Sequence, residues 1–144
     1  MDLQQIYSQI IMQHASSSDH KYEMENPSKK ERGHNPSCGD DISLSIKMNG
    51  DVIEEISFTG HGCAISQAST SLLCELVEGK SIEEAKKKVE LFLNMITGKE
   101  EDEELLEEEL EDAISLQNIS LMPQRVKCAV LAWHTLREML EEKE

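Results

Sequence analysis

Aromatic side chains, long apolar runs and basic residues are all scarce in this sequence. Only 3% of the 144 residues are aromatic, so the core has to be built from aliphatic side chains and methionine. The longest uninterrupted apolar run, Cys128 to Trp133, has six residues, whereas a membrane-spanning helix needs about 20. We therefore predict no membrane association, and the length suits one compact domain over residues 1–144.

Basic residues are outnumbered, with 14 Lys and Arg against 29 Asp and Glu and a formal net charge of −15. Nucleic acids and anionic lipids attract basic surfaces, so we predict binding to neither. The acidic residues concentrate in residues 100–112, which hold ten acids and three leucines. We predict a solvated helix there with Leu105, Leu106 and Leu110 packed inward, and a docking surface for a basic partner is the alternative.

No basic segment followed by an apolar stretch opens the chain, so we see no secretory signal and predict a cytoplasmic protein. In the reducing cytosol, four cysteines more often bind a metal or take part in catalysis than form disulfides. The alternative is a secreted protein with two disulfides, which the missing signal disfavours.

The first part of the chain predicts one helix and then a long connection. Residues 3–14 have the apolar spacing of an amphipathic helix, with Asp2 as its N-cap. Residues 16–37 carry a serine run, two prolines and many charges. Because they offer almost nothing to bury, we predict a long, mobile connection.

A β-hairpin follows, since apolar and polar residues alternate over 42–48 and again over 52–58. Gly50 marks the turn between them. A strict two-residue turn would place Leu44 opposite Glu55 and mix the two faces. We therefore predict an odd-length loop with Gly50 in the left-handed conformation, which keeps the even-numbered apolar side chains together.

The hydrophobic period then changes to that of helices. Apolar stripes predict helices over 65–76 and 82–96, the second with Ser81 as its N-cap. Pro123 suits the first turn of a last helix. Together these elements predict an α+β fold, in which a small antiparallel β-sheet packs against several α-helices.

Three cysteines, Cys38, Cys63 and Cys128, lie at junctions between these elements or in the first turns of a helix. Helix N-termini favour anions, so a cysteine there tends towards the thiolate that binds metal or attacks sulfur. Asp40 lies two residues after Cys38, and in an extended segment both side chains point the same way. Arg125 lies one helical turn before Cys128, where its charge would further favour the thiolate.

Cys38, Asp40, Cys63 and Cys128 could together complete a tetrahedral site that selects zinc or iron over magnesium or calcium. Their separations match no compact zinc finger. The alternative is that they are separate buried cysteines acting as small hydrophobes. Cys74 lies outside this set, and we expect it to be a partly buried spectator.

Three motifs, in this order, resemble those of the U-type iron–sulfur cluster assembly proteins, the NifU N-terminal and IscU-like family. They are Asn35-Pro-Ser-Cys-Gly-Asp40, Gly60-His-Gly-Cys-Ala-Ile-Ser66 and Arg125-Val-Lys-Cys-Ala-Val-Leu-Ala-Trp133. With the hairpin, the resemblance covers about residues 3–14 and 35–141. Lys127 stands where IscU-like scaffolds have a histidine, and a helical segment is inserted at about 80–118. Both features resemble the SufU branch.

The resemblance implies a SufE/NifU-like fold and a zinc-dependent sulfurtransferase. Such an enzyme accepts persulfide sulfur from a cysteine desulfurase (SufS-like) during iron–sulfur cluster assembly. It implies zinc held by Cys38, Asp40, Cys63 and Cys128, with Cys38 as the sulfur acceptor and Arg125 assisting docking or the thiolate.

Two alternatives stay open at this point. The same four residues could assemble a transient [2Fe–2S] iron–sulfur cluster for transfer to recipient proteins, in which case the protein is a scaffold and no enzyme. The partners would again be a desulfurase and downstream cluster-assembly proteins. A third hypothesis is a purely structural zinc domain that binds partners through its acidic helix.

Overall fold

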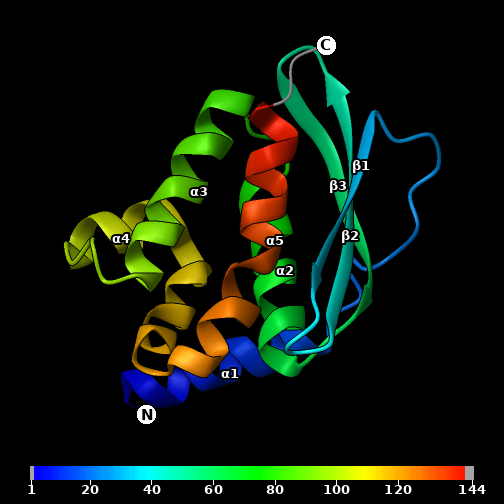
Figure 1. The fold of residues 1–144 in the computed structure, drawn as a ribbon. Coiled ribbons are helices and arrows are strands. Elements are labelled where there is room, and N and C mark those ends of the chain that lie inside the picture. Colours follow the sequence, from blue (N-terminus) through cyan, green and yellow to red (C-terminus); the bar gives the residue numbers. More distant parts are fainter. Residues whose placement is uncertain (1, 142–144) are drawn as a thin grey trace.

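The computed structural model describes residues 2–141, so residues 1 and 142–144 of the predicted domain lie outside the described residues. The elements in chain order are α1 (Leu3–Ala15), β1 (Lys29–Asn35), β2 (Asp40–Asn49), β3 (Val52–His61), α2 (Ala64–Val77), α3 (Ile82–Ile96), α4 (Glu103–Leu110), the 3₁₀ helix η1 (Glu111–Leu121) and α5 (Pro123–Glu141). A three-stranded antiparallel sheet beside these helices confirms the predicted α+β class (Figure 1). Within residues 2–141, every helix is too short or too polar to cross a membrane.

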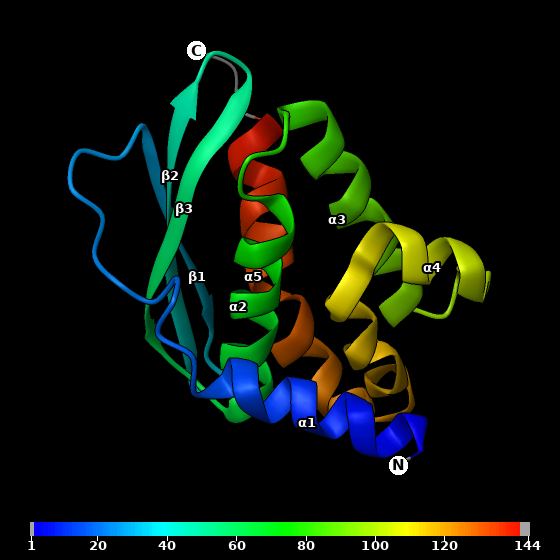
Figure 2. The ribbon, with the colours of Figure 1, turned by 180° about the vertical axis from the view of Figure 1, so that it is seen from behind.

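The core forms between one face of the sheet and the helices α2 and α5, which lie along it (Figures 1 and 2). The even-numbered side chains of β2 supply this face: Ile42, Leu44 and Ile46 are all buried. Leu44 and Ile46 pair with Phe58 and Ile56 of β3, which are buried on the same face. The alternating pattern therefore predicted the core face of this hairpin correctly.

The β2–β3 hairpin has the predicted pairing of apolar faces, but its turn differs from the predicted one. Its loop has two residues, Gly50 and Asp51, so the odd-length loop is wrong, although Gly50 is left-handed with φ of +66°. A bulge at Glu54 of β3 supplies the extra residue instead. Leu44 consequently faces Phe58, and the apolar faces of both strands stay together.

Residues 16–37 were predicted as a connection, and this is wrong for Lys29–Asn35, which form β1 and pair with β2. This strand is held by backbone pairing and by close packing on α5 rather than by an apolar side-chain face. A Cβ on Gly33 would lie 2.3 Å from Thr135 Oγ1 of α5, so only glycine permits this approach. Residues 16–28 pass over the other face of the sheet (Figure 1), and Met24 among them is buried.

The predicted helix starts agree with the structure. Asp2 caps α1 in a capping box with Gln5, the Ser81 side chain caps α3, and Pro123 is the first residue of α5. The apolar face predicted for α1 is only partly buried, because Leu3 and Ile6 near its start are exposed.

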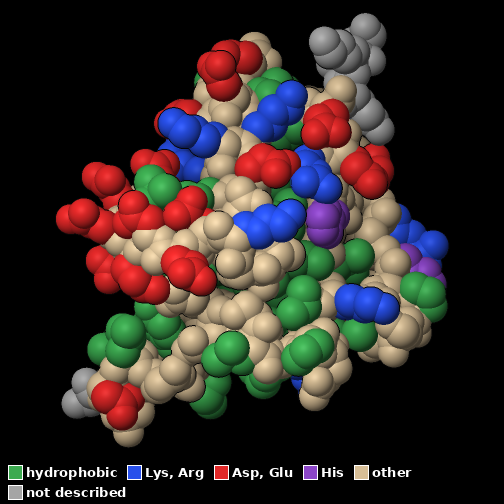
Figure 3. Space-filling model, turned by 60° about the vertical axis from the view of Figure 1, so that its left-hand side comes forward, with side chains coloured by type: hydrophobic (Ala, Val, Ile, Leu, Met, Phe, Trp, Pro, Cys, Tyr) green, Lys and Arg blue, Asp and Glu red, His purple; other side chains and the backbone are tan. Residues whose placement is uncertain are grey.

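The segment between α2 and α5 is helical, as predicted for about residues 80–118, and it is anchored through aromatic stacking. Phe92 of α3 stacks on Trp133 of α5 with ring centroids 3.7 Å apart and planes 4° apart. In α4, Leu106 and Leu110 are buried as predicted, but Leu105 is 36% exposed and its predicted burial is wrong. Acidic side chains gather on one side of the molecule (Figure 3).

Replacing Phe92 by alanine should destabilise the fold strongly, because it removes a buried ring from the stack on Trp133 and leaves a cavity. We expect a loss of about 3–5 kcal/mol in the free energy of unfolding, measured by urea denaturation followed by circular dichroism. The control is Leu121→Ala, whose side chain is exposed and which should change stability by no more than about 0.5 kcal/mol. Equal stabilities of the two variants would contradict this account of the core.

Candidate metal centre

Cys38 lies in the loop of residues 36–39, which joins β1 to β2. The Asn35 carbonyl accepts hydrogen bonds from the N–H groups of Cys38 and Gly39, at 3.2 and 3.0 Å, and Gly39 adopts a φ of +74°. This tight turn leaves the Cys38 side chain half-buried. The Asn35 Nδ2 group donates a hydrogen bond to Cys38 Sγ at 3.5 Å. The Cys38 thiol is therefore partly accessible to solvent and has an amide directed at it.

Asp40, the first residue of β2, has a fully buried carboxyl group, with an exposure of 0%. Its Oδ1 accepts the N–H of Cys63 at 3.1 Å. Its Oδ2 has no hydrogen-bond partner among residues 2–141. A buried carboxylate oxygen without a partner costs free energy, so this atom needs a donor or a cation. The hydrogen bond to Oδ1 fixes the orientation of the carboxylate and leaves Oδ2 available to a donor or a cation.

Cys63 is the N-cap residue of α2, and its side chain makes no capping hydrogen bond. Its thiol is therefore available to other groups at the positive end of the helix dipole. Gly62 before it is required by packing, since a Cβ there would lie 2.6 Å from Asp40 Oδ1 and 3.0 Å from Ser66 Oγ. The glycine thus lets the start of α2 close over the Asp40 carboxylate.

Cys128 reaches the same place from the second turn of α5, where it is 1% exposed. The thiols of Cys38 and Cys128 and a carboxylate oxygen of Asp40 all lie within 4.8 Å of one another. The Cys63 thiol is outside this group of three, and the link of Cys63 to the group is the hydrogen bond from its N–H to Asp40 Oδ1 at 3.1 Å. The structure thus brings together the side chains of Cys38, Asp40 and Cys128, with Cys63 adjoining them through its backbone.

The electrostatics of Cys128 differ from our expectation. Burial raises the pKa of its thiol well above the ordinary range, and the neighbouring Cys38, Cys63 and Asp40 side chains raise this pKa further. The predicted tendency of Cys128 towards thiolate is therefore wrong for the protein without a cation. Arg125 is exposed in the first turn of α5, and the side chains that shift the pKa of Cys128 are Cys38, Cys63 and Asp40.

Packing between α2 and α5 sets the spacing of Cys63 and Cys128. Trp133 Nε1 of α5 donates a hydrogen bond to Ser69 Oγ of α2 at 2.8 Å, and Ser69 Oγ donates to the carbonyl of Ala129. Ala129 is the residue after Cys128, so these buried hydrogen bonds hold the two helices together directly beneath the cluster.

The donor atoms fit a thiophilic divalent cation. Three sulfurs and one carboxylate oxygen suit zinc or iron rather than magnesium or calcium, and four ligands suit tetrahedral coordination. A cation would also supply the missing partner of Asp40 Oδ2. We call Cys38, Asp40, Cys63 and Cys128 the cysteine cluster.

Several polar residues around the cluster were not predicted. Asn35 and Ser37 surround the Cys38 thiol, with Ser37 Oγ 4.0 Å from it, and Ser66 is buried beside Gly62 with no partner for its Oγ among the described residues. All three lie inside the motifs quoted for the resemblance, and that position is the only signal the sequence held for them. Cys74 is fully buried in the core rather than partly buried as predicted, and it lies outside the cluster.

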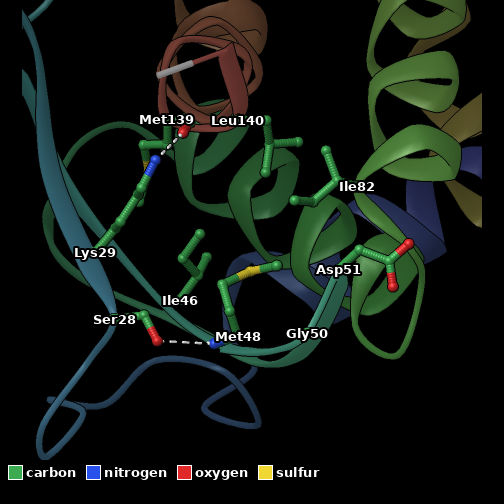
Figure 4. Close-up of a pocket in the computed structure, with 9 residues that line it drawn as sticks. All are labelled: Ser28, Lys29, Ile46, Met48, Gly50, Asp51, Ile82, Met139 and Leu140. Carbon is green, nitrogen blue, oxygen red and sulfur yellow. Dashed lines mark hydrogen bonds between the residues drawn. The ribbon is translucent and has the colours of Figure 1, made fainter. Parts of the chain in front are cut away.

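An apolar pocket of about 350 Å³ lies at the opposite end of the sheet, at the turn between β2 and β3 (Figure 4). Ile46, Met48, Ile82 and Leu140 line it, and the Lys29 ammonium group donates to the Met139 carbonyl at its edge. None of the cysteine cluster borders this pocket, so the cluster and the pocket are separate features.

Comparison with known proteins assigns a family to this arrangement. Residues 6–142 match the family described as "NifU-like N terminal domain". The chain is 38% identical over 143 residues to the zinc-dependent sulfurtransferase SufU of Bacillus subtilis, covering 99% of this chain and 95% of that protein. It is 37% identical over 139 residues to the iron–sulfur cluster assembly scaffold protein IscU of Streptococcus pyogenes, covering 96% and 85% of the two chains.

Solved structures agree with these sequence matches. The crystal structure of FiSufU from Fervidobacterium islandicum AW-1, an iron–sulfur cluster assembly scaffold protein for the SUF system, is similar with a TM-score of 0.87. The two sequences are 39% identical, over 97% of this chain and 100% of that one.

Replacing Gly62 by alanine should weaken metal binding at the cysteine cluster, because the new Cβ would push the Asp40 carboxylate out of position. We expect zinc affinity to fall by at least about tenfold, measured by competition with a chromophoric chelator, while circular dichroism stays unchanged. The matched control is Ala64→Ser, at an exposed position two residues on. If Gly62→Ala binds zinc as tightly as this control, the inferred role of Asp40 Oδ2 is wrong.

Proposed function

This chain belongs to the family of NifU-like N-terminal domains, and from that premise we propose that it is a zinc-dependent sulfurtransferase that accepts persulfide sulfur from a cysteine desulfurase. The observation that carries the proposal is the unequal exposure of the clustered thiols. Cys38 is half-buried on a short loop, whereas Cys128 is buried on a helix. One thiol can therefore leave the cluster and meet a partner while the others stay in place.

Cys38 is the best placed of the three to be the acceptor. Cys63 is also half-buried, but its backbone caps α2, a helix that is buried almost throughout. Moving it would disturb the core, whereas residues 36–39 can shift without breaking a helix or a strand pair. The Asn35 amide, directed at Cys38 Sγ from 3.5 Å, also orients this thiol.

The transfer step is a thiol–persulfide exchange. The Cys38 thiolate attacks the terminal sulfur of a persulfide on the desulfurase's own cysteine. A sulfur–sulfur bond forms at Cys38, the sulfur–sulfur bond on the desulfurase breaks, and its electron pair leaves as the desulfurase thiolate. The proton of the terminal sulfur stays on that sulfur as it moves to Cys38. The step therefore needs no external oxidant or reductant.

Zinc, when bound by Cys38, Asp40, Cys63 and Cys128, supplies the positive charge that keeps these thiols deprotonated in spite of their burial. Asp40 provides the single oxygen ligand, held in place through Oδ1. We assign Arg125 to docking rather than to the buried thiol, because its side chain is exposed on the first turn of α5. We place the reaction in the cytoplasm, with the sulfur passing to downstream cluster-assembly proteins.

Replacing Cys38 by serine should abolish sulfur acceptance and leave the fold intact, because the hydroxyl cannot act as the sulfur nucleophile. The measurement is mass spectrometry of the protein after incubation with a desulfurase and cysteine, which detects the added sulfur atom. We expect no added sulfur on Cys38→Ser under conditions that load the wild-type protein fully.

Cys74→Ala is the control variant, since Cys74 is a cysteine of the core outside the cluster. It should accept sulfur at the wild-type rate. Cys38→Ser protein that still takes up sulfur at this rate would refute the role of Cys38. If the zinc were purely structural, Cys38→Ser would reduce sulfur acceptance only as far as it reduced the stability of the fold. Thermal unfolding of both variants is therefore measured as well.

A scaffold function is the second candidate, because the relative in Streptococcus pyogenes is named as a scaffold and the same ligands suit an iron–sulfur cluster. Metal analysis of protein purified without oxygen separates the two. We expect about one zinc per chain and no visible absorption. A brown protein containing iron and acid-labile sulfide would favour the scaffold.

A further inference from the structure

We propose that His14, Glu75 and Asp112 form a second binding site for a divalent cation, separate from the cysteine cluster. An imidazole nitrogen and one oxygen from each carboxylate lie within 4.8 Å of one another. The three residues come from α1, α2 and η1, which pack against each other in the fold. The segments that meet here are remote in sequence and lie side by side at the foot of the helical layer (Figure 2).

The imidazole of His14 is held in an orientation that suits a metal ligand. Its Nδ1 is hydrogen-bonded to Ser71 Oγ at 2.8 Å, and Ser71 is buried on α2. Its Nε2 faces Glu75 Oε1 at 3.5 Å. A hydrogen bond to one ring nitrogen that directs the other towards the ion is the usual support of a histidine ligand.

Glu75 and Asp112 bring the two carboxylates of this group from different elements, α2 and η1. Glu75 is the only charged residue of α2 and the only exposed one between Ser66 and Val77. Asp112 follows Glu111, which takes a φ of +50° where α4 gives way to η1. A small cavity of about 10 Å³ borders both carboxylate residues, which is room for about one water-sized sphere.

These ligands accept a wider range of ions than the cysteine cluster does, and Mn²⁺ is the ion that separates the two sites. One nitrogen and two oxygens, with water in the remaining positions, fit Mn²⁺, Fe²⁺ or Zn²⁺, and no sulfur is present to favour zinc strongly. The net charge of −15 raises the local concentration of cations. A bound ion would fasten η1, at the end of the inserted segment, to α1 and α2.

The test uses Mn²⁺ added to the full-length, reduced and metal-free protein, because Mn²⁺ binds weakly to thiolates. Electron paramagnetic resonance measures the free ion during the titration. Spin-echo modulation then shows whether an imidazole nitrogen coordinates the bound ion. We expect saturable binding of one Mn²⁺ with nitrogen modulation. The cysteine cluster contains no imidazole, so this signal cannot come from the cluster, and the His14 variant below separates it from the other histidines.

Variants identify the ligands. His14→Gln should abolish the nitrogen modulation, and Asp112→Asn should weaken binding by at least about tenfold, as should Ser71→Ala through the lost support of the imidazole. Glu108→Gln removes the same charge as Asp112→Asn from the exposed face of α4 and should leave the affinity unchanged. Circular dichroism and thermal unfolding check that each variant is folded.

Bound Mn²⁺ without nitrogen modulation would overturn the proposal, and so would equal affinities of the Asp112→Asn and Glu108→Gln variants. In either case the three side chains are a polar surface cluster and not a metal site. The outcome is independent of the proposed sulfur transfer, since it is measured without a desulfurase.

Discussion

The close packing of α2 and α5 on one face of the sheet is the constraint on which the cysteine cluster depends. Buried hydrogen bonds among Ser69, Ala129 and Trp133 hold the two helices together. The positions of Cys63, at the start of α2, and Cys128, on α5, are fixed relative to each other as a result. β1 can lie against α5 because Gly33 has no side chain. The loop that follows β1 then delivers Cys38 and Asp40 to the ends of both helices, so a site assembled from remote segments is a consequence of core packing.

Burial divides the cluster into parts with different uses. Asp40 and Cys128 are shielded from water, and a cation between them would satisfy an oxygen that otherwise has no partner and lower the pKa of a thiol that burial raises. Cys38 stands on the most adaptable backbone of the three cysteines. A cation bound at this cluster would stay attached to the buried Asp40 and Cys128, while Cys38 on its loop could detach from the cation and bind a partner. The proposed sulfur transfer would require both properties, because the nucleophile must be protected between encounters with the desulfurase and available during them.

The acidic surface of α4 and the residues around it has a structural explanation in part. Leu106 and Leu110 anchor α4 in the core, and the Lys88 ammonium group donates hydrogen bonds to Glu109. Most of the other carboxylates of this segment face water and contribute to the net charge of −15. His14, Glu75 and Asp112 stand apart from this general effect, because an oriented imidazole accompanies the two carboxylates.

Local patterns in the sequence determined the fold class, the core face of the hairpin, and the caps at Asp2 and Ser81. The motifs around the cysteines indicated candidate ligands, but only the tertiary structure brings Cys38, Asp40 and Cys128 within 4.8 Å of one another. Alternation, helical period and capping act between residues a few positions apart, so they can be read without knowing what packs against them. Tertiary structure decided the rest. β1 has no apolar pattern, and it forms because it pairs with β2 and packs on α5. The bulge at Glu54 allows a two-residue turn to coexist with the register that keeps the apolar faces together. The pKa of Cys128 is raised, and His14 lies near Asp112, only because segments distant in sequence pack against each other.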